Sequence, residues 1–274
     1  SRTILPEPTF VFFVLGMIYF VDRWIWEGGR SFYYPGLIFS ALAFLIKPWA
    51  IFFIPPLIYS AYRKEKMILP IRKKYIIFSI LAIMPFLLWR LWIQQHPEGI
   101  PYSFWLLNGD NIRFKPIFWW WILSERIGRE VLGITGTVLF FIGILVRPKD
   151  GNYFLHIWAL SSFLFMVIFA TGNVTHNYYQ ILFIPTASVF LALGVSHLVS
   201  GVNGFLSRFW TVPLALLFFP LTFYFSLIPV KEFYKINNPA IIEAGRRADQ
   251  LLPKEAVVVA AYNYDSAFLY QTNR

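Results

Sequence analysis

The polar residues that could do chemistry stand at the borders of long apolar runs. His176, Tyr178 and Tyr179 lie at the start of the run at 178–199, and Lys47 separates two shorter runs. The full set of candidates is Arg2, Glu7, Lys47, Arg113, Lys115, His176, Tyr178 and Tyr179. Lysine and arginine suit a phosphate group, whereas a carboxylate suits the binding or orientation of hydroxyls. A lipid-linked phosphate that carries a polar cargo would satisfy both.

The composition is that of an integral membrane protein. Hydrophobic residues make up 58% of the chain and charged residues only 14%, against about 25% charged in a soluble domain. The absence of cysteine excludes disulfides, thiol catalysis and thiolate metal sites. The net charge of +10 does not indicate nucleic-acid binding, because the basic residues cluster beside apolar runs as they do in cytoplasmic loops.

Eight apolar segments are candidates for membrane-spanning helices, which need about twenty residues each. They are 8–22, 32–46, 48–62, 75–93, 130–146, 153–171, 178–199 and 211–230. Pro48 ends one segment and can begin the next, because a first-turn position needs no N–H. The sequence therefore predicts an all-α polytopic membrane domain over residues 1–230.

The orientation follows from "YRKEKMILPIRKKY" (62–75), which holds six basic residues and one acidic residue and is predicted to be cytoplasmic. Alternation then places 1–7, 94–129, 172–177 and 231–274 on the outer side of a plasma or inner membrane, together with the Lys47–Pro48 junction. The segment 94–129 carries four basic residues against this rule. Its part "KPIFWWWILSERIGRE" predicts a helix along the outer surface. All eight candidate side chains thus reach one face.

Each candidate also has a purely structural interpretation. A carboxylate at Glu7 is favoured by the dipole of the helix that begins there. Lys47 could extend its ammonium to the outer headgroups. Tyr178 and Tyr179 could be interfacial anchors, and His176 could be an ordinary loop histidine.

Residues 231–274 predict the start of a small extracytoplasmic α/β segment. "NPAIIEAGRRADQLLP" (238–253) has apolar residues at helical spacing, and "AVVVAAY" (256–262) is typical of a buried strand. The two ends of the chain, Ser1 and "AFLYQTNR", indicate an internal piece of a longer protein.

Three segments, in this order, resemble the GT-C superfold of membrane glycosyltransferases. They are "SRTILPEPTFVFFVLGMIYF", "GLIFSALAFLIKPWAIFFIPPLIY" and "HNYYQILFIPTASVFLALGV". The nearest branch would contain the dolichyl-phosphate-mannose protein mannosyltransferases and the lipid A aminoarabinose transferases. The closing "LPKEAVVVAAYNYDSAFLYQTNR" resembles the soluble segment that often follows the membrane domain in those proteins.

The resemblance implies a polyprenyl- or dolichyl-phosphate sugar as donor and a protein, lipid or glycan hydroxyl as acceptor. It implies a donor-phosphate contact for Lys47, with Arg2, Arg113 and Lys115 nearby, and orientation of the acceptor or sugar by Glu7. His176, Tyr178 and Tyr179 match an outer "H-x-Y-Y" element and would bind substrate. The family's acidic general base would lie upstream of residue 1, so this chain alone is expected to be inactive. No ligand spacing indicates a metal site or another cofactor, although the sequence leaves a divalent metal open.

Other functions fit the same composition. A transporter or flippase of lipid-linked sugars would bind phosphate with the same cations, but it would place charges near the middle of its helices. An O-antigen ligase or polymerase would also use lipid-linked glycans on the outer face. A membrane anchor for an outer domain would need far fewer than eight spans.

Overall fold

A computed structural model describes residues 5–66, 72–97, 104–200, 208–235, 239–259 and 265–272. These residues form helices and connections, and no strand occurs among them. The chain divides into two compact units, residues 1–226 and 227–274, close to the predicted boundary after residue 230. The helical nature of the membrane domain is confirmed for the residues that the structure describes.

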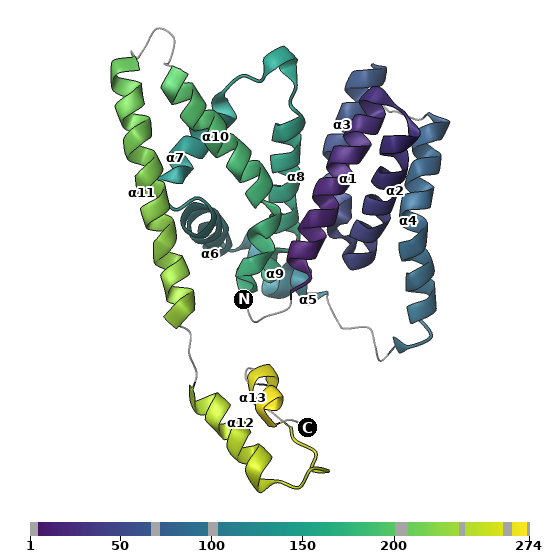
Figure 1. The fold of residues 1–274 in the computed structure, drawn as a ribbon, viewed down its shortest axis with the longest axis vertical. Coiled ribbons are helices and arrows are strands. Elements are labelled where there is room, and N and C mark those ends of the chain that lie inside the picture. The colour runs from purple at the N-terminus through teal and green to yellow at the C-terminus, as the bar shows by residue number, and fades with distance from the viewer. Residues whose placement is uncertain are drawn as a thin grey trace. The chain divides into compact units, whose positions relative to one another are not determined.

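The first unit is built from helices joined by short connections (Figure 1). The α-helices are α1 (Glu7–Glu27), α2 (Arg30–Ile46), α3 (Ile54–Glu65), α4 (Lys73–Ile93), α5 (Trp105–Asn108), α6 (Pro116–Trp120), α7 (Gly136–Leu145), α8 (Phe154–Ile168), α9 (Ala170–Thr175), α10 (Ile184–Ser200) and α11 (Arg208–Lys235), the last of which continues into the second unit. The 3-10 helices are η1 (Pro48–Phe53), η3 (Gly109–Phe114), η5 (Lys149–Gly151) and η6 (Asn177–Leu182). The segment η4 (Trp121–Val131) is a π-helix.

Three helices are long and apolar enough to cross a membrane: α1, α4 and the part of α11 at Phe209–Lys231. A fourth span results if the bent pair Pro116–Val131 and Gly136–Leu145 counts as one. The helices α2, α8 and α10 are apolar but shorter. The predicted membrane protein is therefore supported by these helices, whereas the predicted number of eight spans is not confirmed.

Helix α1 shows why these elements form a membrane bundle. Its buried residues recur at helical spacing along one face: Phe10, Val14, Met17, Ile18, Val21 and Ile25. The other side is also apolar, and Phe12 is 60% exposed and Tyr19 54% exposed. A helix that is apolar all round belongs in a core or in lipid. The residues of α1 that do not pack against the protein therefore suit the lipid chains.

The segment 116–131 runs across the bundle rather than along it. Figure 1 views α6 almost end-on, while α8 runs upright. The axis turns by 104° between this segment and α7. The turn contains Gly133 and Ile134, both with positive φ (60° and 58°). This transverse helix covers the segment in which a surface helix was predicted.

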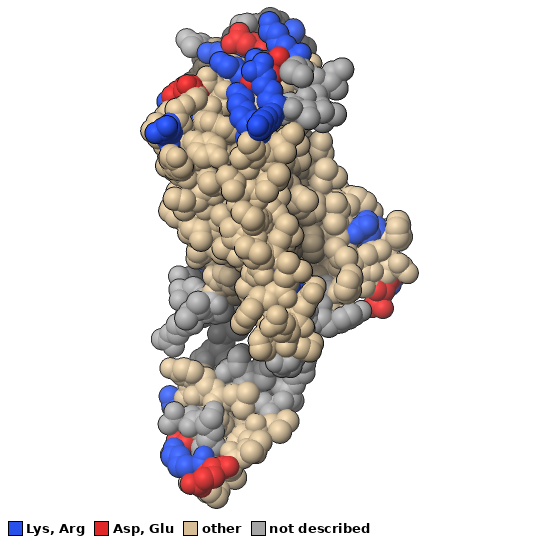
Figure 2. Space-filling model, turned by 90° about the vertical axis from the view of Figure 1, so that its right-hand side faces the viewer, with Lys and Arg blue, Asp and Glu red and all other residues tan. Residues whose placement is uncertain are grey.

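Basic side chains gather at one end of the first unit. Figure 2 shows Lys and Arg concentrated there, beside a broad flank without charged side chains. Arg72 and Lys74 lie at this end and pair with Glu65 over 2.6 and 3.0 Å. A charged end next to an uncharged flank is the distribution expected of a membrane-embedded bundle.

The second unit contains α12 (Pro239–Leu251) and α13 (Asp265–Thr272), which pack together. A Cβ on Gly245 would lie 2.8 Å from the carbonyl oxygen of Phe268, so the two backbones approach closely there. The predicted strand is not found at 256–259, where Val257 is 92% exposed and Val259 90% exposed. These valines have no neighbouring strand among the described residues, and 260–262 lie outside them.

Candidate functional site

An ion pair joins the start of α1 to the end of α2. Lys47 follows the last residue of α2 in extended backbone (φ −151°, ψ 130°), because Pro48 begins the 3-10 helix η1 at that point. Glu7 stands in the first turn of α1, directly after Pro6. The Lys47 ammonium donates to Oε1 of Glu7. The fold thus brings together two residues that are 40 positions apart. The sequence had predicted only that both lie at the same face of the membrane.

This ion pair is largely withdrawn from solvent. The Glu7 side chain is 2% exposed and that of Lys47 15% exposed. The Oε2 atom of Glu7 has no hydrogen-bond partner among the described residues. A buried charge is costly unless it is paired, so Glu7 depends on Lys47 as its counter-ion.

Aromatic rings complete the surroundings of the Lys47 ammonium. Its Nζ lies 4.0 Å from the ring centre of Trp49 and 5.1 Å from that of Tyr179. Both distances are within the range of cation–π attraction. An ammonium has three donors, and only the one to Glu7 ends on a carboxylate. The cation is therefore held in position while part of its hydrogen-bonding capacity remains available to a ligand.

Lys47 lines a cavity of about 780 Å³ between the end of α2, α4, α5 and η6. Most of its wall is apolar or aromatic, and its charged members are Lys47 and Arg90. Arg90 is half-buried near the end of α4 beside Trp89, and it has no ion-pair partner in the described part of the chain. No acidic residue occurs among the described residues of the wall. The cavity therefore presents two cations, one of them uncompensated, in apolar surroundings.

His176 and the two tyrosines lie next to this ion pair. The His176 ring is 5.2 Å from that of Tyr178 and 5.1 Å from that of Tyr179. Burial lowers the pKa of His176; Glu7 opposes this effect and Lys47 adds to it. Of the three residues, Tyr179 alone is part of the described cavity wall.

The other predicted cations are placed differently. Arg113 donates to the carbonyl oxygens of Val167 (2.6 Å), Ile168 (2.6 Å) and Leu107 (3.2 Å). Because the first two belong to the end of α8, Arg113 caps that helix and does not line the cavity with Lys47. Lys115 is exposed and is also not part of the wall. Arg2 lies outside the described residues.

The remaining arginines of the long loop serve the fold. Arg126, 7% exposed, pairs with Glu130 over 2.7 Å and donates to the carbonyl oxygen of Val174 over 2.6 Å. Arg129 pairs with Glu125 over 2.6 Å. These bonds explain how an outer loop can carry extra basic residues, since most of their charge is neutralised locally.

Sequence reasoning did not assign Arg90 and Trp49 to the site. The signal for Arg90 was present, because an arginine interrupts the apolar run of α4 and ionisable residues in such runs are frequently functional. Trp49 had no comparable signal among so many aromatic residues. Its position over Lys47 depends on the turn at Pro48.

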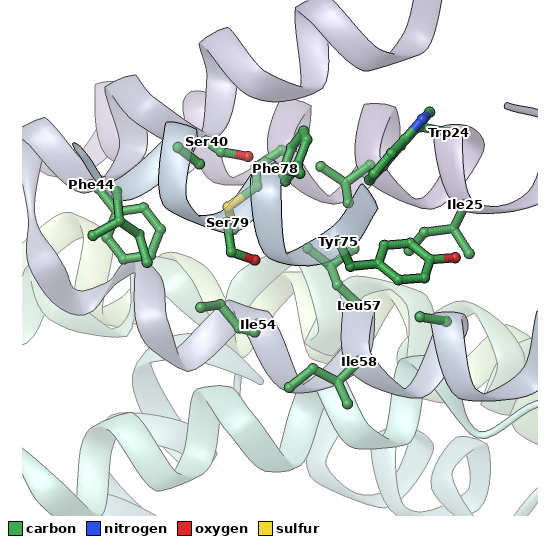
Figure 3. Close-up of a pocket in the computed structure, with 15 residues that line it drawn as sticks. Trp24, Ile25, Ser40, Phe44, Ile54, Leu57, Ile58, Tyr75, Phe78 and Ser79 are labelled. Atoms are coloured by element: carbon green, nitrogen blue, oxygen red, sulfur yellow. The ribbon is translucent and has the colours of Figure 1, made fainter. Parts of the chain in front are cut away.

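A second, apolar cavity of about 110 Å³ lies between α1, α2, α3 and α4 (Figure 3). Trp24, Phe44, Tyr75 and Phe78 line it, and its few polar groups include Ser40 and Ser79. The Ser40 hydroxyl donates to the carbonyl oxygen of Gly36 (2.7 Å). No charged residue lines this cavity among those described, so it suits hydrocarbon rather than a headgroup.

In the described part of the chain, no group of three or more His, Asp or Glu side chains could hold a metal ion. The chain matches no known family model, no curated protein and no solved structure.

Proposed function

We propose that the cavity lined by Lys47 and Arg90 binds the phosphate of a polyprenyl-phosphate-linked sugar, and that the protein is a glycosyltransferase of the GT-C type. The observation that carries the proposal is the presence of two cations in one aromatic-walled cavity without an acidic wall residue among those described. Arginine and lysine are the usual ligands of phosphate. Apolar walls with a few placed polar groups are typical of ligand sites.

The preformed ion pair supports a positioning role for Glu7. Because Glu7 is buried and does not line the described wall, it would orient the Lys47 ammonium toward the phosphate rather than contact the acceptor. Tyr179 and Trp49 hold the same ammonium from its other sides. The cation thus needs little reorganisation when charge develops on a leaving group, which is the condition for effective electrostatic stabilisation.

In the proposed reaction, the oxygen of an acceptor hydroxyl forms a bond to the anomeric carbon of the sugar. The bond between that carbon and the phosphate oxygen breaks, and the lipid phosphate leaves with the electron pair. Lys47 and Arg90 would stabilise the charge on the phosphate. The hydroxyl proton must pass to a base. The described cavity wall contains no carboxylate that could accept it.

The apolar cavity between α2 and α4 supports a lipid-linked ligand. On α2, Phe44 lines the apolar cavity and Leu45 lines the cavity with Lys47. On α4, Ala82 lines the apolar cavity and Phe86 lines the cavity with Lys47. The two cavities thus follow each other along the same pair of helices. An isoprenoid chain whose phosphate lies at Lys47 would find apolar side chains in this direction.

The proposed orientation places Lys47 at the extracytoplasmic side. The basic segment around Glu65 lies at the opposite ends of α3 and α4, and such segments face the cytoplasm. In this orientation residues 1–7, 94–129, 172–177 and 231–274 are extracytoplasmic. The shorter helices α2, α8 and α10, together with the segment formed by η1 and α3, would complete a polytopic arrangement of about eight spans. Fewer residues per span are sufficient where a helix ends in a polar pocket.

One observation favours a flippase of lipid-linked sugars instead. The described cavity wall contains cations but no carboxylate that could activate a hydroxyl. Such a wall is sufficient for binding and movement of the intact lipid. A ligase or polymerase that uses lipid-linked glycans would have the same phosphate site, and its acceptor would distinguish it.

The decisive experiment uses the full-length protein in nanodiscs of neutral lipid with radiolabelled polyprenyl-phosphate sugars. Binding and transfer of label to an acceptor fraction would be measured for the wild type, Arg90→Gln and Lys47→Met. Lys115→Gln is the matched control, because it removes an exposed cation that is not part of the wall. The proposal expects at least about tenfold weaker donor binding in the first two variants and no change in the control.

The outcomes separate the alternatives. Transfer that is lost with Arg90 and Lys47 supports the glycosyltransferase. Binding that is lost with them, without transfer by the wild type but with movement of the intact lipid across proteoliposomes, supports the flippase. Donor binding that is unchanged in both variants would refute the phosphate site.

A further inference from the structure

A second polar cavity, of about 330 Å³, lies at the other end of the bundle from Lys47. Its walls are the connection between α7 and α8 and the last turns of α10. Helix α10 follows η6, which carries Tyr179, and ends at Ser200 beside this cavity. The two cavities are therefore separate, and the proposed donor site does not account for this one.

Two glycines bring the walls together. A Cβ on Gly143 of α7 would lie 1.9 Å from the carbonyl oxygen of Phe190, and one on Gly194 of α10 would lie 2.0 Å from that of Leu139. The backbones of α7 and α10 are thus in direct contact at this crossing. Beyond it, α7 ends at Leu145 and the chain becomes extended at Val146 (φ −63°, ψ 118°). The connection and the end of α10 then line the same cavity.

The connection is held against α3 by specific bonds. The Tyr59 hydroxyl donates to the carbonyl oxygen of Gly151 (3.0 Å) and accepts from the N–H of Tyr153 (3.0 Å). The Arg63 guanidinium donates to the carbonyl oxygen of Asp150 (3.2 Å). Because three bonds fix the loop, the side chains that it presents to the cavity have defined positions.

The cavity is basic. Arg147 and Lys149 come from the loop, His156 from α8 and His197 from α10, and no acidic residue lines the described wall. Arg147 and Lys149 have no ion-pair partner among the described residues, whereas Arg72 and Lys74 at the same end of the bundle are paired with Glu65. Ser196 and Asn152 add further hydrogen-bonding groups. Uncompensated cations with such donors form a site for an anion.

His156 provides independent evidence that the cavity holds a ligand. Its Nε2 lies 3.0 Å from the carbonyl oxygen of Ile144, so this nitrogen carries a proton and donates. Its Nδ1 is buried without a hydrogen-bond partner in the described part of the chain. A buried polar atom without a partner calls for an explanation. Because Nε2 carries the proton, Nδ1 is an acceptor, and a hydroxyl group of a ligand would satisfy it.

We propose that this cavity binds a phosphate-bearing headgroup, with Arg147 and Lys149 as the principal cations and His197 on the opposite wall. A volume of about 330 Å³ is at the lower end of ligand pockets, so a phosphate with a small substituent fits and a large glycan does not. The phosphate could come from an anionic lipid or from a soluble phosphate compound. The chemistry of recognition is the same for both.

The test measures binding to the protein in nanodiscs of phosphatidylcholine. Short-chain phosphatidic acid and inorganic phosphate are titrated separately, and bound ligand is counted by native mass spectrometry. The variant R147Q/K149Q removes both loop cations. The variant H197Q removes the imidazole from the other wall and is the second test if R147Q/K149Q misfolds. The control K66Q/K73Q removes two exposed lysines at the same end of the bundle that do not line the cavity.

We expect at least about tenfold weaker binding in R147Q/K149Q, a smaller loss in H197Q and no change in K66Q/K73Q. Binding of phosphatidic acid alone identifies a lipid headgroup, and binding of both probes identifies a soluble phosphate compound. If neither probe binds the wild type, or if R147Q/K149Q and K66Q/K73Q weaken binding equally, the proposal is wrong. Binding of a probe at the donor site would be unaffected by R147Q/K149Q, because Arg147 and Lys149 do not line that cavity, so the two proposals fail separately.

Discussion

Replacement of Lys47 by methionine should destabilise the protein through Glu7. Methionine keeps much of the apolar stem of lysine but removes the ammonium. The ammonium is the hydrogen-bond partner of Glu7 Oε1, and Oε2 already has no partner among the described residues. The carboxylate, with its side chain 2% exposed, would then remain buried without a counter-ion.

The size of the effect follows from burial. Loss of one partner of a buried ion pair costs about 3–5 kcal/mol of the free energy of unfolding. Lys47 is still 15% exposed, so water screens the pair in part and the lower end applies. We therefore expect a loss of about 3 kcal/mol. Removal of both charges leaves no unpaired group, so E7Q/K47M should recover most of that loss.

Equilibrium unfolding in mixed detergent micelles, followed by tryptophan fluorescence, can measure all four members of this double-mutant cycle. A second readout separates folding from function: E7Q/K47M should be nearly as stable as the wild type and still bind the lipid-phosphate donor poorly. Methionine carries no charge that could bind a phosphate, so donor binding is weak even when the fold is stable.

Two results would contradict this reasoning. A change below about 0.5 kcal/mol in K47M would mean that the variant does not leave Glu7 as a buried, unpaired charge. Additive effects of the two substitutions, within about 0.5 kcal/mol, would mean that the side chains are not coupled in the folded protein.

Three further predictions test other parts of the structure. Arg113→Ala should lower the free energy of unfolding by about 3 kcal/mol, because bonds from a charged donor to three carbonyl groups are lost, and donor binding by the remaining folded protein should be unchanged. Gly194→Ala should destabilise by at least about 2 kcal/mol, since its Cβ would lie 2.0 Å from a backbone carbonyl oxygen, whereas Ala192→Leu on the exposed side of α10 should stay within about 0.5 kcal/mol. Because burial holds the pKa of His176 below its ordinary 6.5, the unfolded chain binds the proton more readily, so stability should fall as the pH drops below 6.5 toward the lowered pKa. Unfolding midpoints between about pH 7.5 and 5 measure this slope, and His176→Gln should remove its share.

Much of the fold was readable from local sequence. The apolar runs predicted helices where α1, α4, α8, α10 and α11 occur, because hydrocarbon permits only backbone that satisfies its own hydrogen bonds. Pro48 correctly marked the end of α2. The strand expected near Val257 was not found in the described residues, since a β-branched run becomes a buried strand only when a partner strand exists.

Some of the candidate residues were correctly predicted to lie close together. The pairing of Glu7 with Lys47, and the nearness of His176 and Tyr179, agree with the convergence inferred from topology. Arg113 shows the limit of that inference. It shares the predicted face, yet its guanidinium is used by the end of α8.

The sequence by itself determined that the chain is an apolar helical protein with its charges at the helix ends, because hydropathy and charge are properties of consecutive residues. Only the tertiary structure decided which of these charges are free to meet a ligand. Glu65 neutralises Arg72, the carbonyl groups of α8 engage Arg113, and Arg90 is left facing the same cavity as Lys47. The net field of a cation depends on neighbours from distant parts of the chain, and no local pattern encodes those neighbours.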